Sequence, residues 1–347
     1  MPTNAIAAAL DSIVLGPSVV VHNLTMIPLV ANRASTSSTR STVSTSSTLG
    51  TFSTPSTDAD GSRAAAEYLV LDEALSSGVV EITEVSEQGS VPDLNFVNRG
   101  ARPVLIVDGE ELLGAKQNRV VNLSILVAAN SELTIPVSCV EAGRWRSRSR
   151  HFTAAPRTQY ATGRAKRMAD VSLSMMVRGE RVSDQAGVWE DIAAKACRLE
   201  ADSPTSAMEA IFERHVGPID EYVAGCRPVE GQVGALFFVG ETLIGFDLFD
   251  RPSTLSKLLP KLVRSVAVDA IDAASMRSKS DDPASAGLDA NAIRARAEQF
   301  LAVASYAPQH VTAAVGLGDD LRITAPRIAC AALVTNSHLV HLGAFAL

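Results

Sequence analysis

The sequence predicts an α+β protein with a β-rich N-terminal half, a helical middle and closing C-terminal strands. Three observations carry this prediction. Short apolar runs separated by Gly, Asn, Ser and Pro fill residues 79–137, a pattern typical of strands joined by turns. Helical periodicity follows over residues 189–214. Short apolar runs then return between residues 311 and 345, which indicates that strands close the chain.

Composition supports a folded, soluble protein. The chain has 347 residues, of which 46% are hydrophobic and 20% charged. This length exceeds the roughly 100–200 residues of one ordinary domain, so it allows one large unit or two smaller ones. The formal charge of -7 argues against duplex nucleic acid as the main partner.

The cysteines and the N-terminus indicate the cellular compartment. The four cysteines are scattered, which indicates neither a zinc site nor a disulfide framework. The N-terminus lacks a cationic start before an apolar stretch, and no apolar run reaches the ~20 residues of a membrane span. We therefore expect a cytoplasmic protein with no membrane partner.

In the N-terminal half, an early strand region over Val19–Val30 is followed by a Ser/Thr-rich stretch at residues 33–63. That stretch holds few large apolar groups, so we expect a flexible, disordered insertion. Beyond it, a strand over Ala64–Leu71 leads into a short helix that Gly78 ends. The next predicted strands are 79–85, 94–97, 103–107, 120–127 and 133–137.

The predicted organisation groups residues 1–32 with 64–142 as a β-rich region. Residues 143–187 form an Arg-rich loop region, and 188–347 form an α+β region packed on the first as one unit. Within the last region we expect a central hairpin made of residues 233–239 and 243–249. The predicted helices are 189–200, 205–214, 255–274 and 291–305, and the closing strands are 311–315, 321–324, 328–333 and 339–345.

Several segments together resemble the ARPP domain family, the proteins associated with ADP-ribosylglycohydrolases and the rhodanese-phosphatase superfamily. The resemblance covers most of the chain outside residues 33–66. It implies a link to NAD and ADP-ribose processing and a site shared by the polar cassette 108–119 and the segment Cys139–Trp145. The segments that carry it are Tyr68–Leu75, Val85–Pro92, Asn98–Gly100, Asp108–Arg119, Ile135–Trp145, Gln232–Ala235, Gly245–Phe249, Gly316–Arg322 and His341–Leu342.

The polar cassette supplies the candidate catalytic carboxylates. Glu110 and Glu111 are adjacent, so in an extended conformation they point to opposite faces and only one can line a given pocket. A carboxylate beside Lys116 and Arg119 could act as a general acid or base in glycosidic chemistry. The alternative is a salt-bridged turn with no catalytic role.

The same cassette offers ligand-binding groups. Lys116, Gln117, Asn118 and Arg119 combine cationic donors with two amides, a set that suits phosphate, carboxylate or purine edges. These residues could equally satisfy strand ends and a turn. Glu141 shares a face with Cys139 if the strand before them continues, which makes Glu141 a third catalytic candidate and leaves Cys139 as structural.

The arginine-rich stretch that follows alternates around an aromatic ring. Arg144, Trp145 and Arg146 could clamp a nucleotide by charge and stacking, or could form a solvated loop. Asp108 and His341 are secondary candidates. His338 and His341 point to opposite faces of a strand, so they indicate no shared metal site.

The sequence therefore predicts a protein that acts on or binds a nucleotide or ADP-ribose-type ligand in NAD-linked metabolism. The alternative is a non-catalytic ligand-binding or scaffold protein with a structural polar network. No residue pattern specifies a cofactor, and none fixes the oligomeric state.

Overall fold

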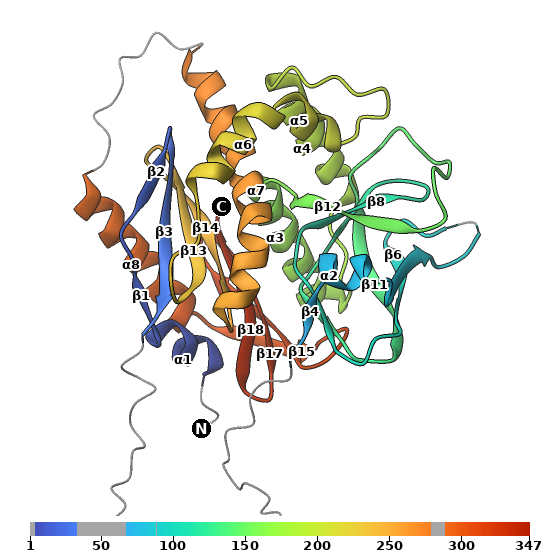
Figure 1. Cartoon of the computed structure of the whole chain (residues 1–347), viewed down its shortest axis with the longest axis horizontal. Helices are drawn as coiled ribbons and strands as arrows, with labels where there is room; N and C mark the ends of the chain where they lie inside the picture. Colours follow the sequence, from blue (N-terminus) through green and yellow to red (C-terminus); the bar gives the residue numbers. More distant parts are fainter. Residues whose placement is uncertain (1–3, 33–66, 88, 279–288) are drawn as a thin grey trace, which may run out of the picture.

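The computed structural model describes residues 4–32, 67–87, 89–278 and 289–347. The molecule is α+β, as the sequence predicts (Figure 1). One large antiparallel sheet carries helices on both faces, and two smaller sheets lie together on the far side of α7 (Pro252–Ser278). Within the described ranges, no helix combines the length and apolar character that a membrane crossing requires.

The large sheet has nine strands, and it joins the two ends of the described chain. Its path places strands from residues 13–31 beside strands from residues 232–346. In sheet order the strands are β1 (Ile13–Leu15), β3 (Leu24–Ala31), β13 (Gln232–Val239), β14 (Thr242–Phe249), β18 (His338–Ala346), β17 (Ile328–Thr335), β16 (Asp319–Ala325) and β15 (Gln309–Ala313), with β2 (Val19–Val21) paired to β3.

The central hairpin of this sheet is covered on both faces, because every residue of β13 is buried. Successive side chains of a strand point to opposite faces. Phe237 therefore joins the core beneath α7, and Phe238 joins the core beneath α8 (Ala290–Tyr306). The short helix α1 (Ala5–Asp11) packs on α8 over that second core. The predicted hairpin and its central position are confirmed.

The other face of the large sheet carries the helices that bring charged groups to the centre of the molecule. Helix α3 (Ala161–Arg178) packs on β17 and β18, and α7 packs on β13. Pro260 lies inside α7 without ending it. The remaining helices of this layer are α4 (Gln185–Arg198), α5 (Glu209–Arg214) and α6 (Val216–Gly225).

The two smaller sheets share a third core with the short helix α2 (Leu71–Ser76). The six-stranded sheet runs β12 (Phe152–Thr158), β8 (Glu110–Gly114), β9 (Arg119–Val121), β11 (Ser131–Cys139), β6 (Asp93–Asn98) and β5 (Val80–Glu84). The three-stranded sheet runs β10 (Ile125–Val127), β7 (Val104–Ile106) and β4 (Leu69–Val70).

Four features differ from the prediction. Residues 13–31 pair with β13 rather than with the strands of 64–142, because their apolar residues complete the core under α1 and α8. The expected Arg-rich loop over 143–187 contains β12 and α3, in which Arg157, Arg164 and Arg167 are buried against carboxylates from other parts of the chain. The predicted strand 120–127 is two strands in different sheets. The cassette itself contains strand β8. The predicted insertion at 33–63 lies outside the described residues.

Candidate functional site

The polar cassette 108–119 does not form one site, because its acidic side chains separate. Glu110 Oε1 accepts a hydrogen bond from Lys261 Nζ at 2.7 Å, and Glu111 Oε2 accepts one from Arg157 Nε at 2.5 Å. The two adjacent glutamates thus pair with different elements, as their alternation on an extended chain predicts. Asp108 pairs with Arg164 and Arg167 of α3.

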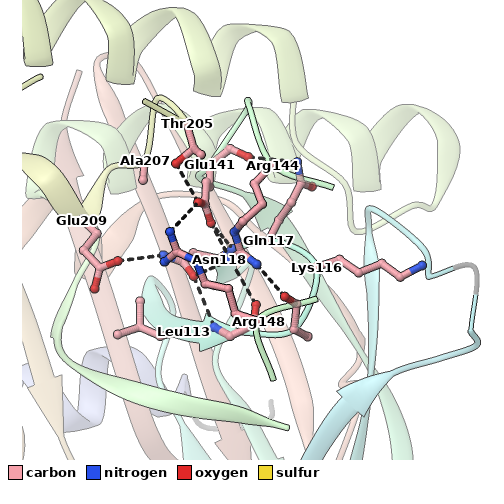
Figure 2. A network of polar contacts seen from close by, with 12 residues as sticks. Leu113, Lys116, Gln117, Asn118, Glu141, Arg144, Arg148, Thr205, Ala207 and Glu209 are labelled. Carbon is pink, nitrogen blue, oxygen red and sulfur yellow. Dashed lines mark hydrogen bonds and ion pairs between the residues drawn. The ribbon is translucent and has the colours of Figure 1, made fainter. Parts of the chain in front are cut away.

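The second half of the cassette meets Glu141, and we call this group the Glu141 network (Figure 2). Its members are Gln117, Asn118, Arg119, Glu141, Arg144 and Thr205, with Glu111, Arg157 and Glu209 at one side. Glu141 Oε2 accepts from Arg144 Nη2 at 2.6 Å and from the backbone N–H of Asn118 at 3.1 Å. Glu141 Oε1 accepts from the Thr205 hydroxyl at 2.7 Å.

Local chain geometry fixes Glu141 in this position. Strand β11 ends two residues earlier, and Glu141 makes an isolated antiparallel bridge to Ala207. A Cβ at Gly143 would lie 2.9 Å from the Thr205 Cα, so only glycine permits the close approach of these two segments. The turn also places Arg144 three residues after Glu141, where its guanidinium reaches the carboxylate.

Two carboxylates of the Glu141 network have pKa values displaced in opposite directions. Burial raises the pKa of Glu111, and the neighbouring Arg157 opposes this only in part. Burial also acts to raise the pKa of Glu141, but hydrogen bonds from Arg144, Thr205 and Asn118 outweigh it, so this pKa is lowered. Glu209 contacts a partner of each carboxylate. Its Oε1 lies 3.5 Å from Nη2 of Arg157, which binds Glu111, and its Oε2 accepts a hydrogen bond from Nδ2 of Asn118, whose backbone N–H binds Glu141.

The cationic part of the Glu141 network has unfilled hydrogen-bonding capacity. Arg119 is fully buried, and its Nη1 donates to Gln117 Oε1 at 3.1 Å. Its Nε and Nη2 have no hydrogen-bond partner within the described part of the chain, and the same holds for Arg144 Nε and Glu111 Oε1. Burial lowers the pKa of Arg119. Buried donors without partners are rare in folded proteins, so this cluster is unusual.

Trp145 covers Arg119 from the outside. Its ring centre lies 5.8 Å from the Arg119 guanidinium carbon and 5.4 Å from the Lys116 ammonium, and 48% of the residue is exposed. Lys116 itself extends away from Glu141, toward the backbone carbonyl of Glu87 (Figure 2). Arg146 is exposed, and its backbone carbonyl accepts a hydrogen bond from Arg144.

The remaining predicted residues lie apart from the Glu141 network. Asp108 and His341 belong to a separate cluster beneath α3. Cys139 is buried, and burial raises the pKa of its thiol, which opposes a nucleophilic role. Across the described ranges, no group of three or more His, Cys, Asp or Glu side chains is arranged to hold a metal ion.

Sequence reasoning missed three members of the network. Thr205 and Glu209 lie more than 60 residues from the cassette, and no local pattern distinguishes them from ordinary helix-start residues. Arg157 is one of many basic residues in the Arg-rich region 143–187, and nothing in the sequence distinguishes it from the others. Its role depends on the pairing of β12 with β8, where Thr158 lies opposite Glu110.

Comparison with known proteins gives a single finding. Searches among characterised proteins and among solved structures found no similar chain. A family model described as the ARG and Rhodanese-Phosphatase-superfamily-associated Protein domain, ARPP-1, matches residues 12–345. This range includes nearly the whole chain and both halves of the large sheet, as the resemblance noted in the sequence implies. The chain therefore belongs to the ARPP-1 family.

Proposed function

We propose that the Glu141 network binds a nucleotide or ADP-ribose-type ligand, with anionic groups on Arg119 and a base or ring stacked on Trp145. The observation that carries this proposal is the buried Arg119 guanidinium, which has two nitrogens without a hydrogen-bond partner beside a half-exposed indole. A phosphate oxygen would supply the missing acceptors through charge-assisted hydrogen bonds.

Entry of the ligand requires Trp145 to leave the face of Arg119. The segment from Ala142 to His151 has no helix or strand, so the indole can turn without breaking regular structure. Exposed Arg146 and Arg148 lie on the same segment and add positive charge to the approach. Stacking of arginine and tryptophan on planar ligand groups is favourable in such a setting.

A fluorescence titration with ADP-ribose tests the binding proposal. In a Trp189→Phe background, emission reports on Trp145 alone, because the chain has two tryptophans. We expect the emission to change on binding and Arg119→Met to weaken affinity about tenfold or more, the effect of losing a hydrogen bond to a charged group. Arg178→Met, at a side chain that is 59% exposed, is the matched control. Equal affinity in all three proteins would contradict the proposal.

A second candidate function is hydrolysis of a glycosidic bond in such a ligand. The opposed pKa directions of Glu111 and Glu141 favour it, since acid–base catalysis uses one carboxyl group that holds its proton more tightly than usual and one that releases it more readily. Mass spectrometry of NAD and ADP-ribose after incubation tests this function. Product from the unmodified protein, absent with Glu111→Gln and with Glu141→Gln, supports an enzyme. Binding without product leaves a ligand-binding module.

A further inference from the structure

A second set of polar residues lies away from the Glu141 network, where the large sheet meets the smaller ones. Ser124 follows β9 in the connection to β10, His341 lies on β18 and Asp247 lies on β14. The Ser124 Oγ is 2.7 Å from His341 Nδ1, and His341 Nε2 is 3.0 Å from Asp247 Oδ1. The three side chains thus form one hydrogen-bonded chain from hydroxyl to imidazole to carboxylate.

The hydrogen bonds agree with a single tautomer of His341. Asp247 is ionised, because Arg164 and His341 lower its pKa well below the ordinary value although burial alone would raise it. The carboxylate accepts a hydrogen bond from Nε2–H, and in the neutral imidazole this leaves the Nδ1 lone pair to accept a hydrogen bond from the Ser124 hydroxyl. The serine oxygen also accepts the backbone N–H of Asp108 at 3.0 Å, so its position is fixed from two sides.

The imidazole is held rigidly in this orientation. Its ring stacks on Phe249 at 4.7 Å between centres, and Arg164 holds Asp247 through two hydrogen bonds of 2.8 and 3.0 Å. Strand pairing places His341 opposite Phe249, two residues along from Asp247.

A small cavity adjoins these groups. It has a volume of about 10 Å³, and its lining includes Asp108, Ser124, Arg322 and His341. A cavity of this size has room for about one water molecule. Ser124 as a residue is only half-buried, and any reaction at its oxygen requires that this oxygen can be reached from outside.

The geometry points to Ser124 as a nucleophile, with His341 as its general base and Asp247 as the residue that positions the imidazole, acting on a small uncharged carboxylic ester. The base is Nδ1 rather than Nε2, the reverse of the arrangement in the serine proteases, but either nitrogen of a neutral imidazole can accept the proton.

The charge around this serine favours an uncharged substrate. Each nearby arginine already binds a carboxylate: Arg164 binds Asp247 and Arg167 binds Asp108. Arg322, which lines the cavity, donates through Nε and Nη2 to Asp320. A phosphate would have to displace one of these partners, whereas a neutral carbonyl group would not.

The reaction balances without any further reagent. As Ser124 Oγ bonds to the ester carbonyl carbon, its proton passes to His341 Nδ1. The bond to the alcohol then breaks, and the leaving oxygen takes that proton. Water next gives a proton to the same nitrogen while its oxygen bonds to the acyl carbon. The bond from the acyl carbon to Ser124 Oγ then breaks, this oxygen takes the proton back from His341 Nδ1, and the acid and the free serine are released.

The first test uses diisopropyl fluorophosphate and p-nitrophenyl acetate as probes. We expect the fluorophosphate to modify the peptide that contains Ser124, with loss of fluoride, and the acetate to give a burst of p-nitrophenol. Ser124→Ala should abolish both signals, and His341→Gln should slow both by about 100-fold or more, the usual contribution of a general base.

The matched control is Ser138→Ala, which removes a buried hydroxyl that bonds to Asn122 and Ser183 but not to a histidine. It should keep both signals. Thermal unfolding of every variant separates loss of the fold from loss of reactivity. Absence of label on Ser124 in the folded unmodified protein overturns the proposal, as does labelling that His341→Gln leaves at full rate.

Discussion

The Glu141 network and a second buried group of charges differ in how completely their polar atoms are paired. The second group, which we call the Lys195 network, consists of Thr162, Lys195, Arg198, Asp269 and Asp272. Lys195 Nζ donates to Asp269 at 2.8 Å and to Asp272 at 2.9 Å. Within the described ranges, no buried side-chain atom of the Lys195 network lacks a partner, whereas the Glu141 network has several.

The two networks also differ in the space beside them. A hollow of about 590 Å³ adjoins Lys195, Asp269 and Asp272, a volume that suits a small molecule. The Glu141 network instead has Trp145 lying over its unpartnered cation. The Lys195 network thus adjoins a hollow but has no buried side-chain atom without a partner in the described part of the chain. The Glu141 network has such atoms, and the Trp145 ring lies over the Arg119 guanidinium, which holds two of them. Under the proposed function, the site is the network with unpaired buried atoms rather than the one beside the hollow.

The largest expected effect is a loss of stability on breaking the Lys195 network. Lys195→Met would leave two buried carboxylates without their shared cation, which costs about 3–5 kcal/mol. Thermal unfolding measures it, and we expect a fall in Tm of about 10 °C. Lys166→Met, at a side chain that is 63% exposed, is the control and should change Tm little. An equal fall in both variants would contradict a structural role for Lys195.

The next largest effect is a loss of stability on weakening the contacts of Glu141. Its carboxylate accepts three hydrogen bonds, as that of Asp269 does. Thr205→Val removes the hydroxyl that donates to Glu141 Oε1 and should cost about 2 kcal/mol. Urea unfolding measures this change. Thr153→Val, at an exposed threonine, should cost far less. If both substitutions have the same effect, Glu141 is not held as tightly as the distances indicate.

Much of this arrangement follows from local sequence, and the rest depends on pairing across the chain. The hairpin 233–249 and the closing strands are readable from apolar runs, because burial on one or both faces dictates their residue types. The opposite directions of Glu110 and Glu111 follow from strand alternation. The residues that pair with Glu110, Glu111 and Glu141 are Lys261, Arg157 and Thr205. These pairings cannot be predicted from the sequence, since nothing near the three residues specifies which strands and helices will meet.

A third prediction uses pH to compare Glu111 with Glu141. The folded pKa of Glu111 lies above the unfolded value of 4.5, so the folded state binds more protons between those two values. Its contribution is therefore present below pH 4.5 and lost as the pH rises through the folded pKa. Glu141 has a lowered pKa, so its contribution is present above pH 4.5 and lost as the pH falls through the folded value.

Unfolding free energies measured across pH 3 to 8 check these signs. As the pH rises through the folded pKa of Glu111, the free energy of unfolding of the unmodified protein should fall relative to that of Glu111→Gln. The expected fall is about 1.4 kcal/mol for each unit by which the pKa is raised. Relative to Glu141→Gln, the unmodified protein should gain stability as the pH rises. Glu213→Gln, at an exposed carboxylate, is the control. Parallel pH curves for all four proteins would show that the two buried glutamates do not differ.

The smallest expected effect on stability is at Arg119, and it separates the two networks most clearly. Arg119→Met removes a buried cation that makes one hydrogen bond and leaves two nitrogens unpartnered. Relief of the desolvation cost should largely offset the lost hydrogen bond and the contact with Trp145, so we expect a change of less than about 1 kcal/mol.

Thermal unfolding of Arg119→Met beside Lys195→Met measures the contrast directly. A residue kept for binding can be lost with little effect on the fold, whereas a residue that neutralises buried carboxylates cannot. If Arg119→Met instead lowers Tm as much as Lys195→Met does, then Glu84 and Glu141, whose negative charges act on Arg119, hold it as a structural cation. The unpartnered nitrogens would then cease to indicate a ligand.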